Sequence, residues 1–338
     1  MADTANDVGD RVTIADIARM ARVSVPTVSK VINGKPGVSD RTRARITGLL
    51  REHEYEPRRS TSTKMIELVL GELTSPWSTA LVTAVEEAAF DQGMGLTLSR
   101  LRPEAEDRWL EMLANRSVDG LVFAVVQVTA RQRAHLEELR LPYVVIDPGE
   151  APAGTRVPTI GVTHWRGAHQ ATRHLLELGH RELAMIAGPA DVMFSQARVD
   201  GFRAAAVGAG VELPPARVRH TEFGYDAGRD AALELLAASP RPTAIFAASD
   251  EQALGVYEAA RLRGVRIPED LSVIGFNDAP IAEWAAPPLT TVREPIRDMA
   301  RLAVAAIRSL AAGEPEVPTV ELATELVIRQ STAPAQQV

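Results

Sequence analysis

Residues 12–34 read VTIADIARMARVSVPTVSKVING, and this stretch predicts two short helices joined by a tight turn. Thr13 can cap the first helix, and Asp16 three residues later gives a spacing close to a capping box. Ser24 can cap the second helix. One face of the first helix is apolar because hydrophobic residues recur at helical spacing, at Ile14, Ile17, Ala18 and Ala21. The stretch therefore predicts a helix-turn-helix.

The second helix of this pair has an outer face of small polar groups and one cation. We expect Val28 and either Val31 or Ile32 to point inward. The side chains expected to point outward are Thr27, Ser29, Lys30 and Asn33. A short helix with such a face fits the major groove of DNA. The alternative is an ordinary helical hairpin with a solvated polar face. A third helix is expected over residues 40–53, with Ser39 as its cap.

The formal net charge of the chain is −7, but the charge is unevenly distributed. Residues 11–64 contain twelve Lys and Arg side chains against five Asp and Glu, so this stretch is basic. The first ten residues and the chain beyond residue 64 are acidic. A basic module on an acidic body concentrates the attraction for phosphate groups in one place. The charge distribution therefore favours nucleic-acid binding by the N-terminal part of the chain.

The N-terminal segment resembles the DNA-binding headpiece of the LacI/GalR family of bacterial transcription regulators. The matching residues are Thr13, Ile17, Ala18, Val23, Ser24, residues 27–33, Val38, Ser39, Thr42, Arg43, Tyr55 and Pro57. The resemblance implies operator contacts from Thr13, Ser24, Val25, Pro26, Thr27, Ser29, Lys30 and Asn33. Direct readout by Val25 and Pro26 must be apolar, for example against a thymine methyl group, because neither side chain has a donor. Lys30 is the candidate for a hydrogen bond to guanine, and a phosphate contact is the alternative.

After Pro57 the sequence departs from the family pattern. Most members continue with a hinge of the type N-x-x-A-R-x-L, which inserts a leucine into the minor groove. Here residues 58–64 are RRSTSTK, and a strand is expected to begin near Met65. The linker is short and lacks the leucine, which puts kinking by an intercalated leucine in doubt. Arg58 and Arg59 are candidates for a narrow minor groove, with a flexible cationic tether as the alternative.

The rest of the chain alternates short apolar runs with amphipathic stretches, which predicts parallel sheets covered by helices on both faces. A length of 338 residues predicts two or three domains. Strands are expected at residues 66–70, 96–98, 121–125, 143–146, 159–162, 183–186, 244–247 and 272–274. Helices are expected at residues 79–92, 130–140, 166–178, 198–210, 227–238, 252–263 and 295–312. Trp109 fits a helix face beside Leu110 and Leu113, so we assign it to the core.

The expected fold class is an all-α helix-turn-helix headpiece followed by an α/β effector domain with two doubly wound parallel-sheet subdomains. We divide the chain into a disordered tail (1–10), the headpiece (11–57), a hinge (58–64), a two-lobed effector-binding and dimerisation domain (65–330) and a second tail (331–338). Ligands in open α/β sheets bind at the carboxyl ends of strands, and between two lobes those ends face a shared cleft.

This second part also resembles the effector domain of the LacI/GalR family, which is similar to periplasmic sugar-binding proteins. The motifs include HL at residues 174–175, LGHR at 178–181, IAGP at 186–189, IPEDLSVIGFND at 267–278 and PLTTV at 288–292. The effector-binding residues proposed on this basis are Trp77, Asp147, His164, Trp165, Arg198, Phe223, Asp250, Asn277 and Trp284. A sugar requires flat aromatic platforms and bidentate polar groups, which these residue types supply.

Some of these assignments have structural alternatives. A tryptophan at a strand end is often a core lid or an interface anchor. Asp250 and His164 can each serve as the cap of a following helix instead of reaching the cleft. Arg198 is the strongest candidate, because a lone arginine at a cleft is otherwise costly.

The resemblance implies a repressor of carbohydrate-utilisation genes that a sugar or oligosaccharide releases from a palindromic operator, acting as a homodimer. The segments at residues 72–77 and 164–165 look like those of an actinobacterial subgroup associated with plant polysaccharides. The chain has no cysteine, so no cysteine–zinc site is possible, and we expect no metal and no cofactor. We also expect a cytoplasmic protein, because residues 1–10 lack the features of a secretory signal.

Two other classes of function are weighed against this one. An enzyme is not favoured, because the sequence contains no G-x-S-x-G, P-loop, G-x-G-x-x-G or H-E-x-x-H motif. A catalytic pair of carboxylates remains open, although nothing selects one. A transport binding protein is opposed by the basic N-terminal segment. Operator binding that depends on sugar without turnover distinguishes the three classes.

Overall fold

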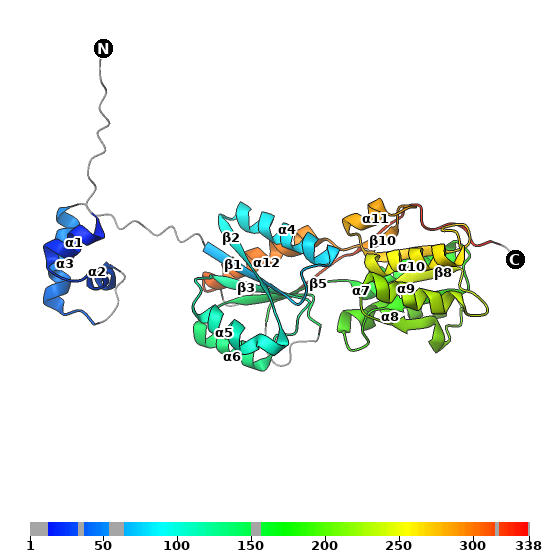
Figure 1. Cartoon of the computed structure of the whole chain (residues 1–338), viewed down its shortest axis with the longest axis horizontal. Coiled ribbons are helices and arrows are strands. Elements are labelled where there is room, and N and C mark those ends of the chain that lie inside the picture. The colour runs from blue at the N-terminus through cyan, green and yellow to red at the C-terminus, as the bar shows by residue number, and fades with distance from the viewer. Residues whose placement is uncertain (1–12, 33–36, 54–63, 150–156, 315–317, 337–338) are drawn as a thin grey trace, which may run out of the picture. The chain divides into compact units, whose positions relative to one another are not determined.

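The structure is a computed structural model that describes residues 13–32, 37–53, 64–149, 157–314 and 318–336. The chain divides into two compact units, residues 1–63 and residues 64–338 (Figure 1).

The first unit contains the three expected helices, α1 (Ile14–Ala21), α2 (Val25–Ile32) and α3 (Asp40–Glu52). The capping box at the start of α1 is confirmed, since the Thr13 side chain accepts from the backbone N–H of Asp16 and the Asp16 carboxylate accepts from the N–H of Thr13. Ser39 caps α3, whose last residue lies one position before the expected end. The three helices enclose a small core of Ile17, Ala18, Ala21, Val28, Val31 and Ile46.

The second unit consists of two lobes, each built on one sheet. The strands of lobe 1 are β1 (Lys64–Leu70), β2 (Met94–Arg100), β3 (Gly120–Ala124), β4 (Tyr143–Ile146), β5 (Thr159–Val162) and β11 (Val320–Leu322). They lie in the order β11-β5-β4-β3-β1-β2. The helices of lobe 1 are α4 (Pro76–Asp91), α5 (Glu106–Ala114), α6 (Ala130–Leu139) and α12 (Ile296–Ala311), with a 3₁₀ turn η1 (Pro103–Ala105).

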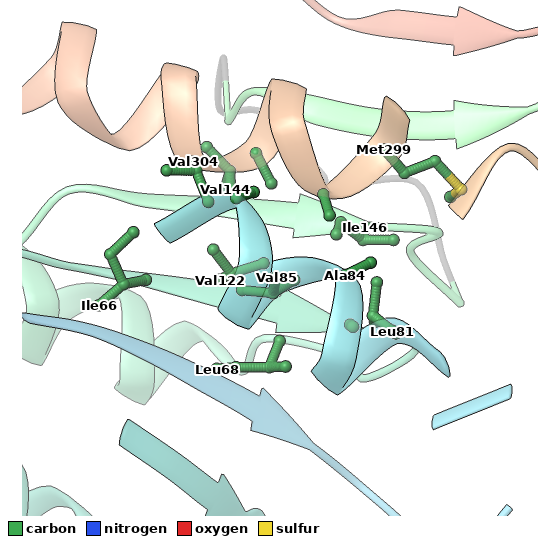
Figure 2. Close-up of a cluster of buried hydrophobic side chains, with 14 of the residues drawn as sticks. Ile66, Leu68, Leu81, Ala84, Val85, Val122, Val144, Ile146, Met299 and Val304 are labelled. Carbon is green, nitrogen blue, oxygen red and sulfur yellow. The ribbon is translucent and has the colours of Figure 1, made fainter. Parts of the chain in front are cut away.

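Helices cover both faces of the lobe 1 sheet, as expected for buried parallel strands. On one face, α4 and α12 pack against the central strands. Figure 2 shows Leu81 and Val85 of α4 and Met299 of α12 in one cluster with Val122 and Val144 of the sheet. On the other face, Trp109 is buried in the core as expected, and its ring lies edge-on to Phe123 with 6.0 Å between centroids.

Lobe 2 repeats this architecture. Its strands are β6 (Leu183–Ala187), β7 (Val218–His220), β8 (Ala244–Ala247), β9 (Ser272–Asn277), β10 (Thr290–Arg293) and β12 (Glu325–Val327), in the order β12-β10-β9-β8-β6-β7. Its helices are α7 (His164–Glu177), α8 (Met193–Gly208), α9 (Tyr225–Leu236), α10 (Asp250–Arg263) and α11 (Pro280–Trp284), with a 3₁₀ turn η2 (Pro215–Arg217). The pair β10–β12 is antiparallel, and the other described pairings of both sheets are parallel.

The chain crosses between the two lobes at three places: after β5 at residues 163–164, after β10 at residues 294–295 and between β11 and β12 at residues 323–324. Two of these crossovers are joined by hydrogen bonds. The Thr163 and Thr324 hydroxyl oxygens lie 3.0 Å apart, and the Thr324 N–H donates to the Thr163 hydroxyl over 3.0 Å. The three crossovers therefore form a hinge between the lobes, distinct from residues 58–64, and two of the three are hydrogen-bonded to each other.

The expected fold class is confirmed, and eight expected strands correspond to β1–β6, β8 and β9. The helix expected around Trp109 is α5, whereas α11, β7, β10, β11 and β12 were not predicted from the sequence, because these elements are short or lack a clear apolar period. The expected domain end at residue 330 differs from the structure. Ser331 is fully buried and its hydroxyl donates to the Val273 carbonyl over 2.6 Å, so the segment after residue 330 is packed on lobe 2.

Candidate functional site

A cavity of about 490 Å³ lies between the two lobes of the second unit. Most of its wall comes from the carboxyl ends of strands and the loops that follow them, which is where ligands of parallel α/β sheets bind. Five of the nine residues proposed for the effector line it, namely Trp77, Asp147, Arg198, Phe223 and Asn277.

Three strand ends in the wall have an unusual backbone. Val125, Asp147 and Asn277 follow or end β3, β4 and β9, with φ values of +54°, +43° and +110°. L-residues rarely adopt this conformation, and for a β-branched residue such as Val125 it is a clear outlier. Backbone outliers of this kind gather at functional sites, where the surrounding structure holds them in place. All three residues line the cavity.

Arg198 of α8 lines the cavity and is the centre of a buried polar network. Its residue is 4% exposed, and its guanidinium carbon lies 3.7 Å from the centroid of the Phe276 ring. One terminal nitrogen donates to the Ala248 carbonyl over 2.6 Å, and the other donates to the Glu294 carboxylate over 3.0 Å. Burial lowers the pKa of Arg198, while the charge of Glu294 opposes this shift.

His164 lies between this arginine and Asp147. Arg198 donates to its Nδ1 over 3.2 Å, and its Nε2 lies 3.1 Å from an oxygen of Asp147. A guanidinium can only donate, so Nδ1 accepts, and the proton of the neutral ring is on Nε2, where it donates to Asp147. His164 is thus buried behind the wall and holds two lining residues in position, and its backbone begins α7.

Asp147, His164 and Glu294 also form a group with one potential metal-ligand atom each, all within 4.8 Å of one another. The positive charge of Arg198 already lies 3.0 Å from Glu294 and in contact with His164. A metal cation there would face the guanidinium at short range. We therefore assign these carboxylates to the arginine and not to a metal.

Glu294 connects both lobes. Its Oε2 accepts from the indole N–H of Trp77 on α4 over 2.6 Å and from the Asn277 amide over 2.8 Å. Trp77 is positioned by the start of α4, where Ser75 caps the helix and Pro76 occupies its first position. The residue that receives these bonds lies on the crossover after β10.

Four of the proposed effector residues lie outside the cavity wall, namely His164, Trp165, Asp250 and Trp284. Trp165 is 45% exposed and stacks on His169 with 4.9 Å between ring centroids. Trp284, at the end of α11, is 76% exposed and lines a separate groove.

Asp250 is buried beneath the wall, where its carboxylate accepts from the Thr291 hydroxyl and the Ala279 N–H. Burial raises its pKa to about 8. The cap of α10 is Ser249 and not Asp250. Asp250 thus connects α10 to the loop after β9 and to β10.

Several residues that line the cavity were not predicted from the sequence, namely Glu72, Val125, Phe194, Glu222, Ser249, Glu251 and Glu294. Phe194 stacks on Phe223 with 5.8 Å between ring centroids. Burial and the charge of Glu72 raise the pKa of Glu251 to about 7. Asp147 was selected because it follows the carboxyl end of a strand. The same position is held by Val125, Ser249 and Glu294, which follow β3, β8 and β10 closely. Glu294 was missed because β10 itself was missed.

Of the side chains expected to point outward from α2, Lys30 is exposed and Thr27 and Ser29 are half-buried. Val25, Pro26 and Lys30 of α2 are exposed, while Val28 is buried as expected. The hydroxyl groups of Ser24 and Thr27 lie 2.9 Å apart at the start of α2. Thr13 is exposed at the start of α1, and Ser29 is half-buried. Asn33, Arg58 and Arg59 lie outside the described residues.

Two family descriptions match the chain. Residues 13–58 match "Bacterial regulatory proteins, lacI family", and residues 172–332 match "Periplasmic binding protein-like domain". The chain is 34% identical to the HTH-type transcriptional regulator DegA of Bacillus subtilis, over 96% of this chain and 99% of DegA. It is 35% identical to the HTH-type transcriptional regulator CelR of Thermobifida fusca, over 95% of this chain and 98% of CelR.

Solved structures agree with these relatives. A complex of the transcriptional regulator CelR with cellobiose matches with a TM-score of 0.73 and 33% identity, covering 94% of this chain and 99% of that one. The lac repressor dimer bound to operator and the anti-inducer ONPF matches with a TM-score of 0.71 and 25% identity, covering 96% of this chain and 100% of that one.

The fold, the interlobe cavity and these matches define a helix-turn-helix transcription regulator with a periplasmic-binding-protein-like effector domain. The chain belongs to the LacI family of bacterial regulatory proteins. It is a DNA-binding regulator and not an enzyme, as the sequence analysis expected. Within the described residues, no helix is both long and apolar enough to cross a membrane.

Proposed function

We propose that this regulator is a repressor of carbohydrate-utilisation genes and that a saccharide in the interlobe cavity releases it from its operator. The observation that carries this proposal is the composition of the cavity wall, where the rings of Trp77 and Phe223 combine with Asp147, Arg198 and Asn277. Aromatic faces cover the C–H surfaces of a sugar ring, and the polar groups bind its hydroxyls. The structure of the relative CelR with cellobiose supports a saccharide ligand.

We propose that Val25, Pro26 and Lys30 read base edges in the major groove. Their exposure at the start and outer face of α2 supports this role. Thr13, Ser24, Thr27, Ser29 and Asn33 are proposed to contact the DNA backbone or bases nearby, and Arg58 and Arg59 to approach the minor groove. A homodimer presents two headpieces to a palindromic operator, one for each half-site.

The saccharide acts by differential affinity for two arrangements of the lobes. If it binds the closed arrangement better, it shifts the dimer toward the state in which the headpieces no longer match the half-sites. A coupling of roughly 1–3 kcal/mol per ligand changes operator affinity by about 5-fold to 150-fold.

No cofactor is proposed. We place the protein in the cytoplasm, as suits a DNA-binding regulator. Its resemblance to a plant-polysaccharide subgroup favours glucose- or xylose-based oligosaccharides.

The test is fluorescence anisotropy of an operator fragment taken from the DNA upstream of the gene, titrated with full-length protein at fixed salt. The titration is repeated with a panel of mono- and oligosaccharides. The expected result is tight binding without sugar and release by one member of the panel. If DNA binds and no saccharide changes its affinity, the saccharide site is wrong.

Two matched variants locate the effect. Trp77 lines the cavity, and its indole N–H donates a hydrogen bond to Glu294. Trp77→Phe removes this donor and keeps an aromatic ring. Trp165→Phe makes the same change at a residue outside the wall. The first variant should need a higher saccharide concentration for release, and the second should respond like the parent protein. Equal responses would contradict the placement of the site.

A further inference from the structure

We infer that the interlobe cavity selects its effector by charge, accepting an uncharged saccharide and rejecting a saccharide that carries a carboxylate or a phosphate. This inference rests on the proposed function, since it takes the cavity to be the effector site. It assigns the selection to Glu222 and Glu251 of lobe 2, together with Glu72 of lobe 1.

The described wall of the cavity is strongly acidic. It contains five carboxylates, those of Glu72, Asp147, Glu222, Glu251 and Glu294, against the single guanidinium of Arg198. The low-dielectric wall on both sides strengthens the field of these groups in the space between them.

The one cationic side chain of this described wall has its charge already paired. Arg198 donates to Glu294 over 3.0 Å, to the Ala248 carbonyl over 2.6 Å and to His164 over 3.2 Å. Its other face covers the Phe276 ring. A ligand carboxylate or phosphate would have to take the guanidinium from Glu294, which would leave a buried carboxylate without its partner.

Three other carboxylates of the wall, those of Glu72, Glu222 and Glu251, have no such compensation. Within the described part of the chain, the side chains of Glu222 and Glu251 have no hydrogen-bond or ion-pair partner, and Glu72 accepts only from the Thr74 hydroxyl, over 2.6 Å. Burial and the charge of Glu72 raise the pKa of Glu251 to about 7. Glu72 and Glu251 come from opposite lobes, so their fields overlap inside the cavity.

These free carboxylates match the hydroxyls of a neutral sugar. An ionised carboxylate only accepts hydrogen bonds, and a sugar hydroxyl donates one. An anionic substituent brings further acceptors and a like charge, so it loses the hydrogen bonds and adds repulsion. The same wall therefore binds a polyol and excludes its oxidised or phosphorylated derivative.

The first test is isothermal titration calorimetry with the full chain at pH 8, where Glu251 is mostly ionised. The probes are two pairs, glucose with glucuronate and cellobiose with cellobiouronate, in which one hydroxymethyl group becomes a carboxylate. The acid of a pair whose neutral member binds should bind at least about 100-fold more weakly. Glu222→Gln/Glu251→Gln should narrow this ratio at least tenfold. Equal affinity for both members of a pair would overturn the inference.

The second test needs no ligand and separates a failure of the inference from a failure of the proposed function. In a Trp165→Phe/Trp284→Phe protein, the remaining emission comes from Trp77 in the cavity wall and Trp109, which is 7% exposed in the lobe 1 core. Anionic iodide should quench Trp77 weakly relative to neutral acrylamide. Adding Glu222→Gln/Glu251→Gln should raise iodide quenching at least about twofold and leave acrylamide quenching unchanged.

A matched control removes the same charge elsewhere. Glu104→Gln/Glu111→Gln neutralises two exposed carboxylates of lobe 1 outside the cavity wall and should change neither quencher nor the binding ratio. Iodide quenching that does not respond to the cavity variant would overturn the inference, even if none of the four sugars binds. If the quenching responds and no sugar binds, the charge selection stands and the saccharide assignment of the site is wrong.

Discussion

At the residue scale, the Arg198–Glu294 pair makes both side chains depend on each other. The two side chains are 4% and 1% exposed, so each charge has little access to water. Arg198→Met should lower the free energy of unfolding by about 3–5 kcal/mol, because Glu294 and Asp147 stay buried without their cation. Adding Glu294→Gln should recover part of this loss, so the double variant should cost about 1–3 kcal/mol less than the sum of the singles.

Urea denaturation followed by circular dichroism measures this cycle. Arg173→Met breaks the exposed Arg173–Glu177 pair on α7 and serves as a control that should leave the denaturation midpoint nearly unchanged. Additive losses from Arg198→Met and Glu294→Gln would show that the two side chains do not stabilise each other.

The backbone conformation of Val125 predicts a substitution that stabilises the protein. Val125 has φ of +54° and is 38% exposed, so its side chain contributes little to the core while its backbone is strained. Asparagine tolerates this conformation, and Val125→Asn should raise the free energy of unfolding by roughly 1 kcal/mol. Val126→Asn is the matched control and should lower it, because Val126 packs on the lobe 1 core. Thermal melts compare the two, and a lower melting temperature for Val125→Asn would refute the strain argument.

At the element scale, the segment after β12 is tied to lobe 2 by two histidines. His180 is 3% exposed and lies 2.9 Å from the Ser272 hydroxyl and 3.0 Å from the Ala333 carbonyl. His174 lies 3.0 Å from the Thr332 hydroxyl. Burial lowers the pKa of both residues from the usual 6.5, so both are neutral in the folded protein.

These two histidines should make the folded protein less stable as the pH falls below 6.5. The unfolded chain protonates these histidines below pH 6.5, and the folded chain does so only at lower pH, so their contribution to stability is full above 6.5 and is lost as pH falls toward the lowered values. Melting temperatures between pH 8 and 5 should therefore drop less in His174→Gln/His180→Gln than in the parent. The comparison is needed because the raised pKa of Asp250 acts in the opposite direction. Parallel curves would contradict this role.

The elements that the sequence predicted well are those with long apolar runs or a clear helical period. The bounds of β4, β5 and β8 match the expected residues, and Trp109 is in the core as expected. β10 was missed because Val292 is the single apolar residue of TTVR, and with it Glu294 was missed. Trp165 and Trp284 show the limit at the site, because a residue near a strand end can point to either side and only the packed fold determines which.

At the scale of the whole molecule, the division at residue 63 predicts that the two units are separable. Both sheets, the interlobe cavity and all three crossovers lie within residues 64–338. Deleting residues 1–63 should therefore abolish operator binding and leave saccharide affinity within about twofold of the parent. Anisotropy and calorimetry measure the two properties on the same preparation. A truncated protein that still retards operator DNA would contradict the assignment of DNA binding to the helix-turn-helix.

The hinge between the lobes should transmit the effect of a bound saccharide to the operator-binding unit, because any signal from the cavity must pass through movement of the lobes. The hydroxyl of Thr324 donates to the Thr163 carbonyl over 3.2 Å and lies 3.0 Å from the Thr163 hydroxyl, so it joins two crossovers at the point where the lobes turn. Thr324→Val keeps the shape and removes these bonds. Neither threonine lines the cavity, so saccharide affinity should change little. The ratio of operator affinities without and with saccharide should fall by about 3-fold to 10-fold, since a looser hinge transmits less of the difference between the two lobe arrangements.

Thr319→Val is the control, because the Thr319 hydroxyl is hydrogen-bonded to Thr159 within lobe 1 and spans no crossover. An unchanged ratio in Thr324→Val, or an equal fall in Thr319→Val, would show that the coupling does not depend on this hydrogen-bonded pair.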